Sequence, residues 1–296
     1  AHTTASDGVL SIVELAQQSG SVEEVLAAAD SACYVAKKQS SAGSSVSIYS
    51  ARDEAAARSS GEIHWLQQLQ SAIKQERFEL ATQTIMPVSP TMRTGPAMEV
   101  LVRMRDEAGQ ELPPTDFVRA AERYGLMGVI DRWVVQKSMD AIVSGQLAVP
   151  AGRCVAINIS GQTLGDTQFL EFVVECFDRT GVSPNQVCFE MSESAVVANL
   201  DHARRFVGVL HGIGCRFALD DFGSGVGSFS NLKTLPLDYL KIDGAFTRNL
   251  GQDSVNQAMV AAMIQLARTL NFQVIAEQVE DTAALEAARR LGVDFI

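Results

Sequence analysis

Short apolar runs alternate with longer segments of helical periodicity from residue 78 to the end of the chain. The runs have the length of buried strands, and the segments between them have the length of crossover helices. This alternation predicts parallel strands joined by helices, and eight strands predict an α/β fold of the (β/α)8 TIM-like barrel type. The predicted strands are 78–85, 98–103, 154–159, 187–191, 216–219, 239–242, 273–276 and a last one that begins at Asp294.

The spacing of apolar residues also predicts the helices that surround such a barrel. They cover residues 62–75, 114–123, 130–144, 167–180, 200–210, 254–270 and 282–291. The eighth strand is cut by the end of the chain at Ile296, so we expect a C-terminally truncated barrel that lacks its final segment.

The chain before residue 62 follows a different pattern. Residues 8–14 predict a strand, and Ser21 followed by Glu24 predicts the capped start of a helix. Residues 39–61 are rich in Ser and Ala, apart from a strand-like run at 46–49, which is typical of a junction between domains. We therefore expect an N-terminal fragment (1–50), a linker (51–61) and a barrel domain (62–296).

The composition narrows the classes of function. With 47% hydrophobic residues and a net charge of -11, the chain can bury a large core, and no basic groove for polymeric nucleic acid is expected. An anionic ligand would need metal ions or a few placed cations. The five cysteines form no Cys-x-x-Cys pair and the four histidines have no ligand spacing, which favours a reducing compartment and argues against a zinc site.

Targeting signals are not recognisable in the sequence. No apolar run approaches the roughly 18 residues of a membrane span, and no signal-peptide pattern is present. We expect a cytoplasmic domain, and a longer parent chain anchored at the inner membrane is compatible with that expectation.

Polar residues stand at the carboxyl ends of the predicted strands. Asp220 and Asp221 follow a buried run, where two adjacent carboxylates are costly unless a cation compensates them. Taken alone, Asp-Asp before Gly is also ordinary turn chemistry. Other strand ends carry Asn158, Glu190, Lys241, Asp243 and Glu277. In a parallel barrel these ends share one rim, where active sites lie, so we interpret the set as a site.

The donors in this set suit Mg²⁺ or Mn²⁺, which prefer oxygen ligands, and the acids suffice for two ions. Two such ions can clamp the attacking and leaving oxygens of a phosphoryl transfer and activate a water. Lys241 then has two possible roles, which the sequence leaves open. It either acts directly on the water or the developing charge, or it is a counter-ion to the acids.

Several motifs in the predicted barrel together resemble one known family. They are Glu99-Val-Leu-Val-Arg103, Asn158-Ile-Ser160, Glu190-Met-Ser-Glu193-Ser194, Asp220-Asp221-Phe-Gly-Ser-Gly225, Leu240-Lys241-Ile-Asp243 and Ala276-Glu277-Gln-Val-Glu280. Residues 78–296 resemble the EAL domain, the family of phosphodiesterases that open cyclic di-GMP to linear pGpG. Cyclic di-GMP is thus the expected ligand.

The resemblance implies a role for each matching residue. The first metal ion would be bound by Glu99, Asn158, Glu190 and Asp220, and the second by Asp220, Asp221 and Glu277. Lys241 would lie near the attacking water, Glu277 could also act as a general base, and Glu193 would position the loop 222–228. The substrate contacts would be Gln83, Leu101, Arg103 and Asp131. Arg103 has a physical rationale, since its guanidinium is a fixed donor fork for phosphate.

The N-terminal part resembles a second family. The run Ala29-Asp-Ser-Ala-Cys-Tyr-Val-Ala-Lys37 is similar to the end of a GGDEF domain, the diguanylate cyclase fold. The signature loop of that family is absent, so the resemblance implies an α+β fragment without cyclase activity. Together the two resemblances imply upstream sensor domains in a longer parent, and they allow a homodimer through the barrel domain.

The sequence departs from the EAL pattern in places that bear on the site. The naming triplet is Glu99-Val-Leu, Gln278 stands where glycine is common, and Val226-Gly227 replaces a Tyr-Ser pair in the loop. Gln278 brings side-chain bulk next to Glu277. A polar residue of the family's site would follow Ile296, so we expect this chain to be less active than its parent.

Three alternatives to hydrolysis of cyclic di-GMP remain open at this point. The barrel could be a receptor that binds cyclic di-GMP without cutting it, although every metal-ligand position is filled. It could be a Schiff-base enzyme that uses Lys241, although surrounding acids would keep the amine protonated. It could also be a regulatory scaffold that works through partner proteins.

Overall fold

The computed structural model describes residues 65–225 and 233–296 in full, together with the backbone of two N-terminal strands, β1 (His2–Ser6) and β2 (Val9–Val13). These strands pair antiparallel. The strand predicted at 8–14 is confirmed by β2, whereas β1 was not predicted because His-Thr-Thr-Ala-Ser lacks apolar alternation. The predicted capped helix, the strand at 46–49, the linker at 51–61 and the GGDEF-like run lie outside the described residues.

The chain separates into two compact units, Ala1–Gln68 and Leu69–Ile296. Residues 65–74 are helical, in agreement with the helix predicted at 62–75 as far as that segment is described. The described residues of the second unit form an eight-stranded sheet. Its strands are β3 (Phe78–Thr84), β4 (Gly95–Arg105), β5 (Glu111–Leu112), β6 (Arg153–Asn158), β7 (Val187–Ser192), β8 (Arg216–Phe222), β9 (Tyr239–Ile242) and β10 (Gln273–Ala276).

The strands follow the order β10-β9-β8-β7-β6-β4-β3, with β5 paired to the outer end of β4. Along the order from β4 to β10 each neighbouring pair is parallel, as predicted, whereas the two-residue β5 pairs antiparallel with β4. The prediction was wrong for the first strand, since β3 runs antiparallel to β4. Only residues 85–94 join these two strands, and a parallel partner needs a crossover of a dozen or more residues. The barrel therefore departs from a regular (β/α)8 repeat at its start.

The ring is joined through the last residues of the chain. Phe295 bridges in parallel to Ile275 of β10 and antiparallel to Pro87, which follows β3. Met86 and Ile296 exchange two backbone hydrogen bonds of 2.7 and 2.9 Å. The last predicted strand, which begins at Asp294, is thus present as a β-bridge that connects the two ends of the sheet.

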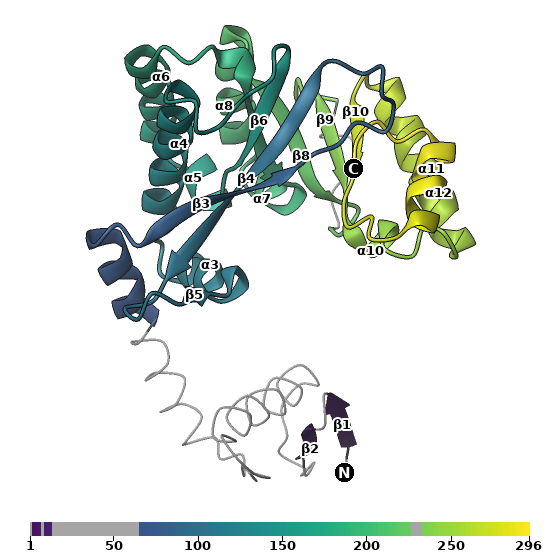
Figure 1. The fold of residues 1–296 in the computed structure, drawn as a ribbon, viewed down its shortest axis with the longest axis horizontal. Helices are drawn as coiled ribbons and strands as arrows, with labels where there is room; N and C mark the ends of the chain where they lie inside the picture. The colour runs from purple at the N-terminus through teal and green to yellow at the C-terminus, as the bar shows by residue number, and fades with distance from the viewer. Residues whose placement is uncertain (1, 7–8, 14–64, 226–232) are drawn as a thin grey trace. The chain divides into compact units, whose positions relative to one another are not determined.

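Helices cover the outside of the sheet, with α4, α6 and α8 along one flank and α11 and α12 along another (Figure 1). The long ones are α3 (Pro114–Arg123), α4 (Met127–Val143), α6 (Thr167–Thr180), α8 (Leu200–Ile213), α11 (Ser254–Thr269) and α12 (Thr282–Leu291). These confirm the predicted helices. None of the helices in the described ranges has the length and apolar character needed to cross a membrane.

Three short helices that the pattern did not predict follow directly after strands. They are α5 (Gly161–Leu164), α7 (Glu193–Ala198) and α10 (Gly244–Thr247). Each begins at a side-chain cap, formed by Ser160, Ser192 and Asp243 respectively. Helices of four to six residues are too short to show a helical period, which is why the apolar pattern missed them.

An apolar layer fills the interior below the predicted site. It contains Ile85, Cys154, Ala156, Cys188, Ala218, Tyr239, Ile275 and Phe295. Side chains two positions apart on a strand share one face. Two positions beyond Ala156, Cys188, Ala218, Tyr239 and Ile275 come Asn158, Glu190, Asp220, Lys241 and Glu277. The apolar layer therefore ends where the polar set begins, on the same face of five neighbouring strands.

Candidate metal and active site

The end of β8 brings two adjacent carboxylates to the same side. Neighbouring residues of a regular strand point to opposite faces, but the β8–β9 register shifts between Leu219 and Phe222. Asp221 has a φ of 54°, in the left-handed region that Asp tolerates better than most residues. Its backbone N–H donates to Asp220 Oδ1 over 3.0 Å. This bulge explains how both aspartates contribute to one site.

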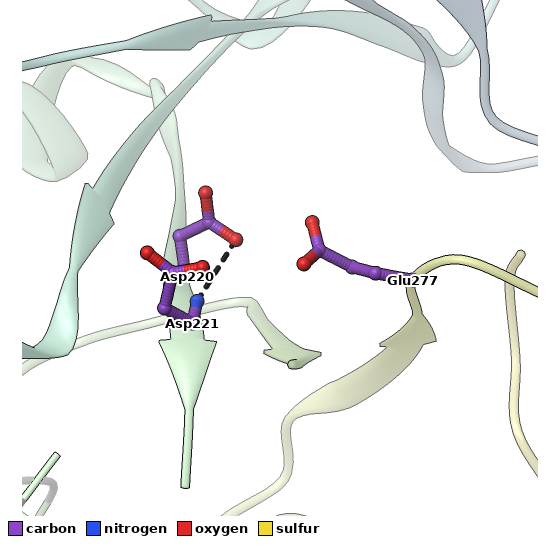
Figure 2. A group of neighbouring side chains, drawn as sticks. All are labelled: Asp220, Asp221 and Glu277. Atoms are coloured by element: carbon purple, nitrogen blue, oxygen red, sulfur yellow. Dashed lines mark hydrogen bonds between the residues drawn. The ribbon is translucent and has the colours of Figure 1, made fainter. Parts of the chain in front are cut away.

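Glu277 completes a group of three acids. Its carboxylate reaches from the end of β10 toward the two aspartates on β8 (Figure 2). One carboxylate oxygen from each of Asp220, Asp221 and Glu277 lies within 4.8 Å of the others, close enough to hold a metal ion. These are the three residues predicted to bind the second ion.

Lys241 connects this group to the other predicted ligands. It is 2% exposed, and its Nζ lies 3.3 Å from Glu99 Oε2, 2.8 Å from Glu190 Oε2, 3.0 Å from Asp220 Oδ1 and 2.8 Å from Glu277 Oε1. Asn158 Nδ2 donates to Glu99 Oε1 over 2.7 Å. All six predicted ligand residues are thus brought together at one rim of the sheet.

The site carries more negative than positive charge. Burial raises the pKa of Glu190 to about 8 and the pKa of Glu277 to about 7, and Lys241 only partly opposes these shifts. Burial followed by the charge of Asp220 also raises the pKa of Asp221. Bound cations would relieve this excess.

Burial alone would lower the pKa of Lys241, but its carboxylate neighbours, Glu190 first, raise it well above its ordinary value. The ammonium therefore stays protonated at neutral pH. This argues against the Schiff-base interpretation, because an attacking amine must be neutral.

One oxygen atom in the cluster has no partner. Glu190 is 1% exposed, and its Oε1 is buried without a hydrogen bond in the described part of the chain, while Oε2 accepts from Lys241. An unpaired buried carboxylate oxygen is unfavourable unless a cation or donor meets it. With this atom and a donor set of carboxylates and one amide, the residues fit a hard divalent cation such as Mg²⁺ or Mn²⁺.

Glu193 lies where the predicted loop-positioning role requires it. It begins α7, and its Oε2 accepts a 3.1 Å hydrogen bond from the backbone N–H of Gly223, two residues after Asp221. Gly223 has a φ of 97°. The contact fixes the start of the loop, whereas residues 226–228 of that loop lie outside the described residues.

The predicted substrate contacts fall into two groups. Gln83 on β3 pairs in register with Glu99 on β4, and Leu101 and Arg103 follow at two-residue steps from Glu99, so these three share the face of the metal ligands. Arg103 Nε lies 3.3 Å from Glu111 Oε1. Asp131 on α4 differs from this group, as the next contacts show.

Asp131 is 3% exposed, and its carboxylate accepts from Ser160 N over 3.0 Å and from the Thr163 hydroxyl. Ser160 stands two residues after Asn158. Asp131 therefore anchors the segment that follows the ligand-bearing strand, and its role as a substrate contact stays a prediction.

Sequence reasoning missed two residues that hold Glu277 in place. The Thr247 hydroxyl donates to the Glu277 carbonyl, and Arg248 donates to the side chain of Gln278. Thr247 is the last residue of α10 and Arg248 is its C-cap, so both belong to the short helix that the apolar pattern did not predict. Only a structure could reveal this contact, because β9 and β10 are separated by a long helix.

Comparison with known proteins points to one family. The sequence profile of the EAL domain matches residues 66–296. Cyclic di-GMP phosphodiesterase PdeB of Shewanella oneidensis is 30% identical over 273 residues, which is 92% of this chain and 31% of PdeB. Cyclic di-GMP phosphodiesterase PdeF of Escherichia coli is 32% identical over 235 residues, which is 79% of this chain and 31% of PdeF. The chain thus spans about a third of these relatives.

Solved structures agree with the family match. The FimX EAL domain of Pseudomonas aeruginosa bound to c-di-GMP has a TM-score of 0.71 at 26% identity, covering 78% of this chain and 92% of the FimX chain. The PaMucR phosphodiesterase in complex with c-di-GMP has a TM-score of 0.72 at 28% identity, covering 78% of this chain and 93% of that one. The fold of the second unit is shared with both.

Proposed function

Because the chain belongs to the EAL domain family, we propose that it is a phosphodiesterase that uses two divalent metal ions to hydrolyse cyclic di-GMP to linear pGpG. The observation that carries the proposal is the convergence of the six predicted oxygen-ligand residues at one rim, with Lys241 contacting four of them. The names of the relatives PdeB and PdeF support the substrate.

Two sets of residues would hold the metal ions. Glu99, Asn158, Glu190 and Asp220 form one set, and Asp220, Asp221 and Glu277 form the other. Bound ions supply Lewis acidity and lower the pKa of water. Glu190 Oε1, which is buried and has no hydrogen bond within the described residues, would gain such a partner.

The protein's own groups divide the remaining work. Arg103, with Gln83 and Leu101 on the same face, would bind and orient the dinucleotide, with the guanidinium directed at a phosphate. Glu277, whose carboxylate lies beside Asp220 and Asp221, would take the proton of the attacking water. The new P–O bond replaces the P–O3′ bond, and the leaving O3′ gains a proton from solvent. Lys241 supplies a fixed positive charge beneath the acids.

Turnover by the purified chain tests this proposal. With Mg²⁺ or Mn²⁺ we expect cyclic di-GMP to be converted to pGpG. Asp220→Asn and Glu99→Ala should each lower the rate by at least about 100-fold, because each variant loses a carboxylate that would bind a metal ion. Glu171→Gln, an exposed acid on α6, is the matched control and should leave the rate unchanged. Binding of cyclic di-GMP without turnover at any metal concentration would support the receptor instead.

The remaining expectations stay predictions. They include a homodimer through this domain, upstream sensor domains and a cytoplasmic location. PdeB and PdeF are about three times as long as the segments that align with this chain.

A further inference from the structure

The residue after Glu277 has an unusual backbone conformation. Gln278 has a φ of 49°, in the left-handed region where glycine is favoured. A non-glycine residue in this region carries strain, and such strain persists only when surrounding contacts hold it. Gln278 therefore needs contacts that explain its conformation.

Two residues on and beside α10 provide these contacts. Arg248 donates from its guanidinium to Gln278 Oε1. The Gln278 carboxamide lies directly over Gly244, where an added Cβ would come within 2.2 Å of Gln278 Oε1. The side chain is thus confined between a donor and a glycine that leaves room for it.

The same helix also holds Glu277 itself. The Thr247 hydroxyl donates to the Glu277 carbonyl, and the Glu277 N–H donates to the Ile242 carbonyl over 3.3 Å. Glu277 is therefore held through its backbone by β9 and α10, while its carboxylate faces Asp220 and Asp221. A change at Gln278 would act on a metal ligand without touching the ions.

We propose that Gln278, clamped by Arg248 over Gly244, is a positioning residue that pre-orients Glu277 for metal binding. The inference rests on the proposed function of the same site. Glycine at this position would adopt the left-handed conformation without strain, but the backbone next to Glu277 would then be free to move. Metal binding would have to fix this backbone, and the entropy lost would weaken the affinity for the metal ion. In this chain a side-chain clamp replaces the free backbone.

Calorimetric titration with Mn²⁺ alone tests the proposal on the full chain. We expect Gln278→Gly and Arg248→Met to weaken binding at the site that contains Glu277 by roughly tenfold, the low end for residues that support metal ligands. Gln278→Glu keeps an acceptor for Arg248 and should restore binding to within about twofold. In Gln278→Gly and Arg248→Met, the Mg²⁺ concentration that gives half the maximal rate should rise. Once Mg²⁺ is saturating, the KM of these variants for cyclic di-GMP should equal that of the unchanged chain.

Asn271→Gly is the matched control. Asn271 is a second left-handed residue, with a φ of 62°, that precedes the other end of β10. We expect this variant to bind Mn²⁺ as the unchanged chain does. The melting temperature of Gln278→Gly separates two roles of Gln278. If Gln278 only stabilises the fold, this variant should melt at a lower temperature than the unchanged chain. If Gln278 positions Glu277, the variant should melt at the same or a higher temperature and still bind Mn²⁺ more weakly.

The two failures can be told apart. Equal Mn²⁺ affinities of Gln278→Gly and the unchanged chain would overturn this inference alone. If the unchanged chain bound no Mn²⁺, both the proposed function and the inference would be overturned.

Discussion

At the residue scale, Lys241 decides how so many acids can lie together. A lysine that is 2% exposed is tolerated because carboxylates surround it, and those carboxylates are tolerated partly because of the lysine. The sequence predicted most of this set because its members stand at the carboxyl ends of apolar strands, whereas Glu99 was predicted only from the resemblance to the EAL domain. It could not predict that Asp131 is turned toward Ser160, since the direction of that side chain depends on tertiary packing.

Replacing Lys241 by methionine should destabilise the metal-free protein. The change leaves four neighbouring carboxylates without their cation, and losing one partner of a buried ion pair costs about 3–5 kcal/mol. Urea unfolding in EDTA measures the free energy. Lys74→Met, at an exposed position, should change it by less than about 0.5 kcal/mol. Equal stability of Lys241→Met and the unchanged chain would show that the lysine does not compensate the acids.

The acids should also make stability depend on pH. The pKa of Glu190 is raised to about 8 and that of Glu277 to about 7, above their ordinary value of 4.5. The folded state thus holds protons that the unfolded state has released, so in EDTA the free energy of unfolding should fall as pH rises from about 5 to about 8. Chemical unfolding at a series of pH values measures this slope. Glu190→Gln should flatten it, and a slope unchanged in that variant would contradict the assignment.

At the element scale, the ends of strands and the short helices after them shape the site. The bulge in β8 turns both aspartates to one side, and α5, α7 and α10 begin immediately after β6, β7 and β9. Strand positions could be predicted because buried strands are apolar runs. The bulge and these short helices could not, since a single left-handed residue or one helical turn leaves no periodic signal.

Asp131 tests how α4 supports the segment after β6. Asp131→Ala removes the acceptor for Ser160 N and the Thr163 hydroxyl, and leaving buried donors unpaired costs about 1–3 kcal/mol. Asp131→Asn keeps an acceptor oxygen and should lose less. Thermal and urea unfolding measure both. If Asp131→Ala kept full stability but raised KM for cyclic di-GMP, the residue would be a substrate contact and not an anchor.

At the scale of the whole barrel unit, the sheet is joined into a ring by residues from both ends of the unit. The parallel order from β4 to β10 was predicted, whereas the antiparallel β3 was not, because apolar runs carry no information about strand direction. The side chain of Phe295 lies against Gly95, which has a φ of 112° at the start of β4. Phe295 and Gly95 lie at opposite ends of the barrel sequence, so only the closed sheet brings the phenyl group against the glycine.

Gly95→Ala should therefore destabilise the unit. Its Cβ would lie 2.3 Å from the Phe295 ring, so overpacking of about 1–3 kcal/mol adds to left-handed strain of about 1–2 kcal/mol. Gly109→Ala shares the left-handed backbone, with a φ of 80°, but its Cβ would meet nothing within 4 Å. The difference between the two variants in urea unfolding isolates the contact with Phe295. Equal losses would show that Phe295 does not pack there in solution.

We propose that oxygen atoms from separate strands form one site for two metal ions. Anomalous diffraction from crystals of the chain grown with Mn²⁺ would locate these ions. We expect two peaks about 4 Å apart, both in contact with Asp220, one also beside Glu99 and Glu190 and the other beside Asp221 and Glu277. No peak at these residues, with Mn²⁺ bound elsewhere or not at all, would contradict it.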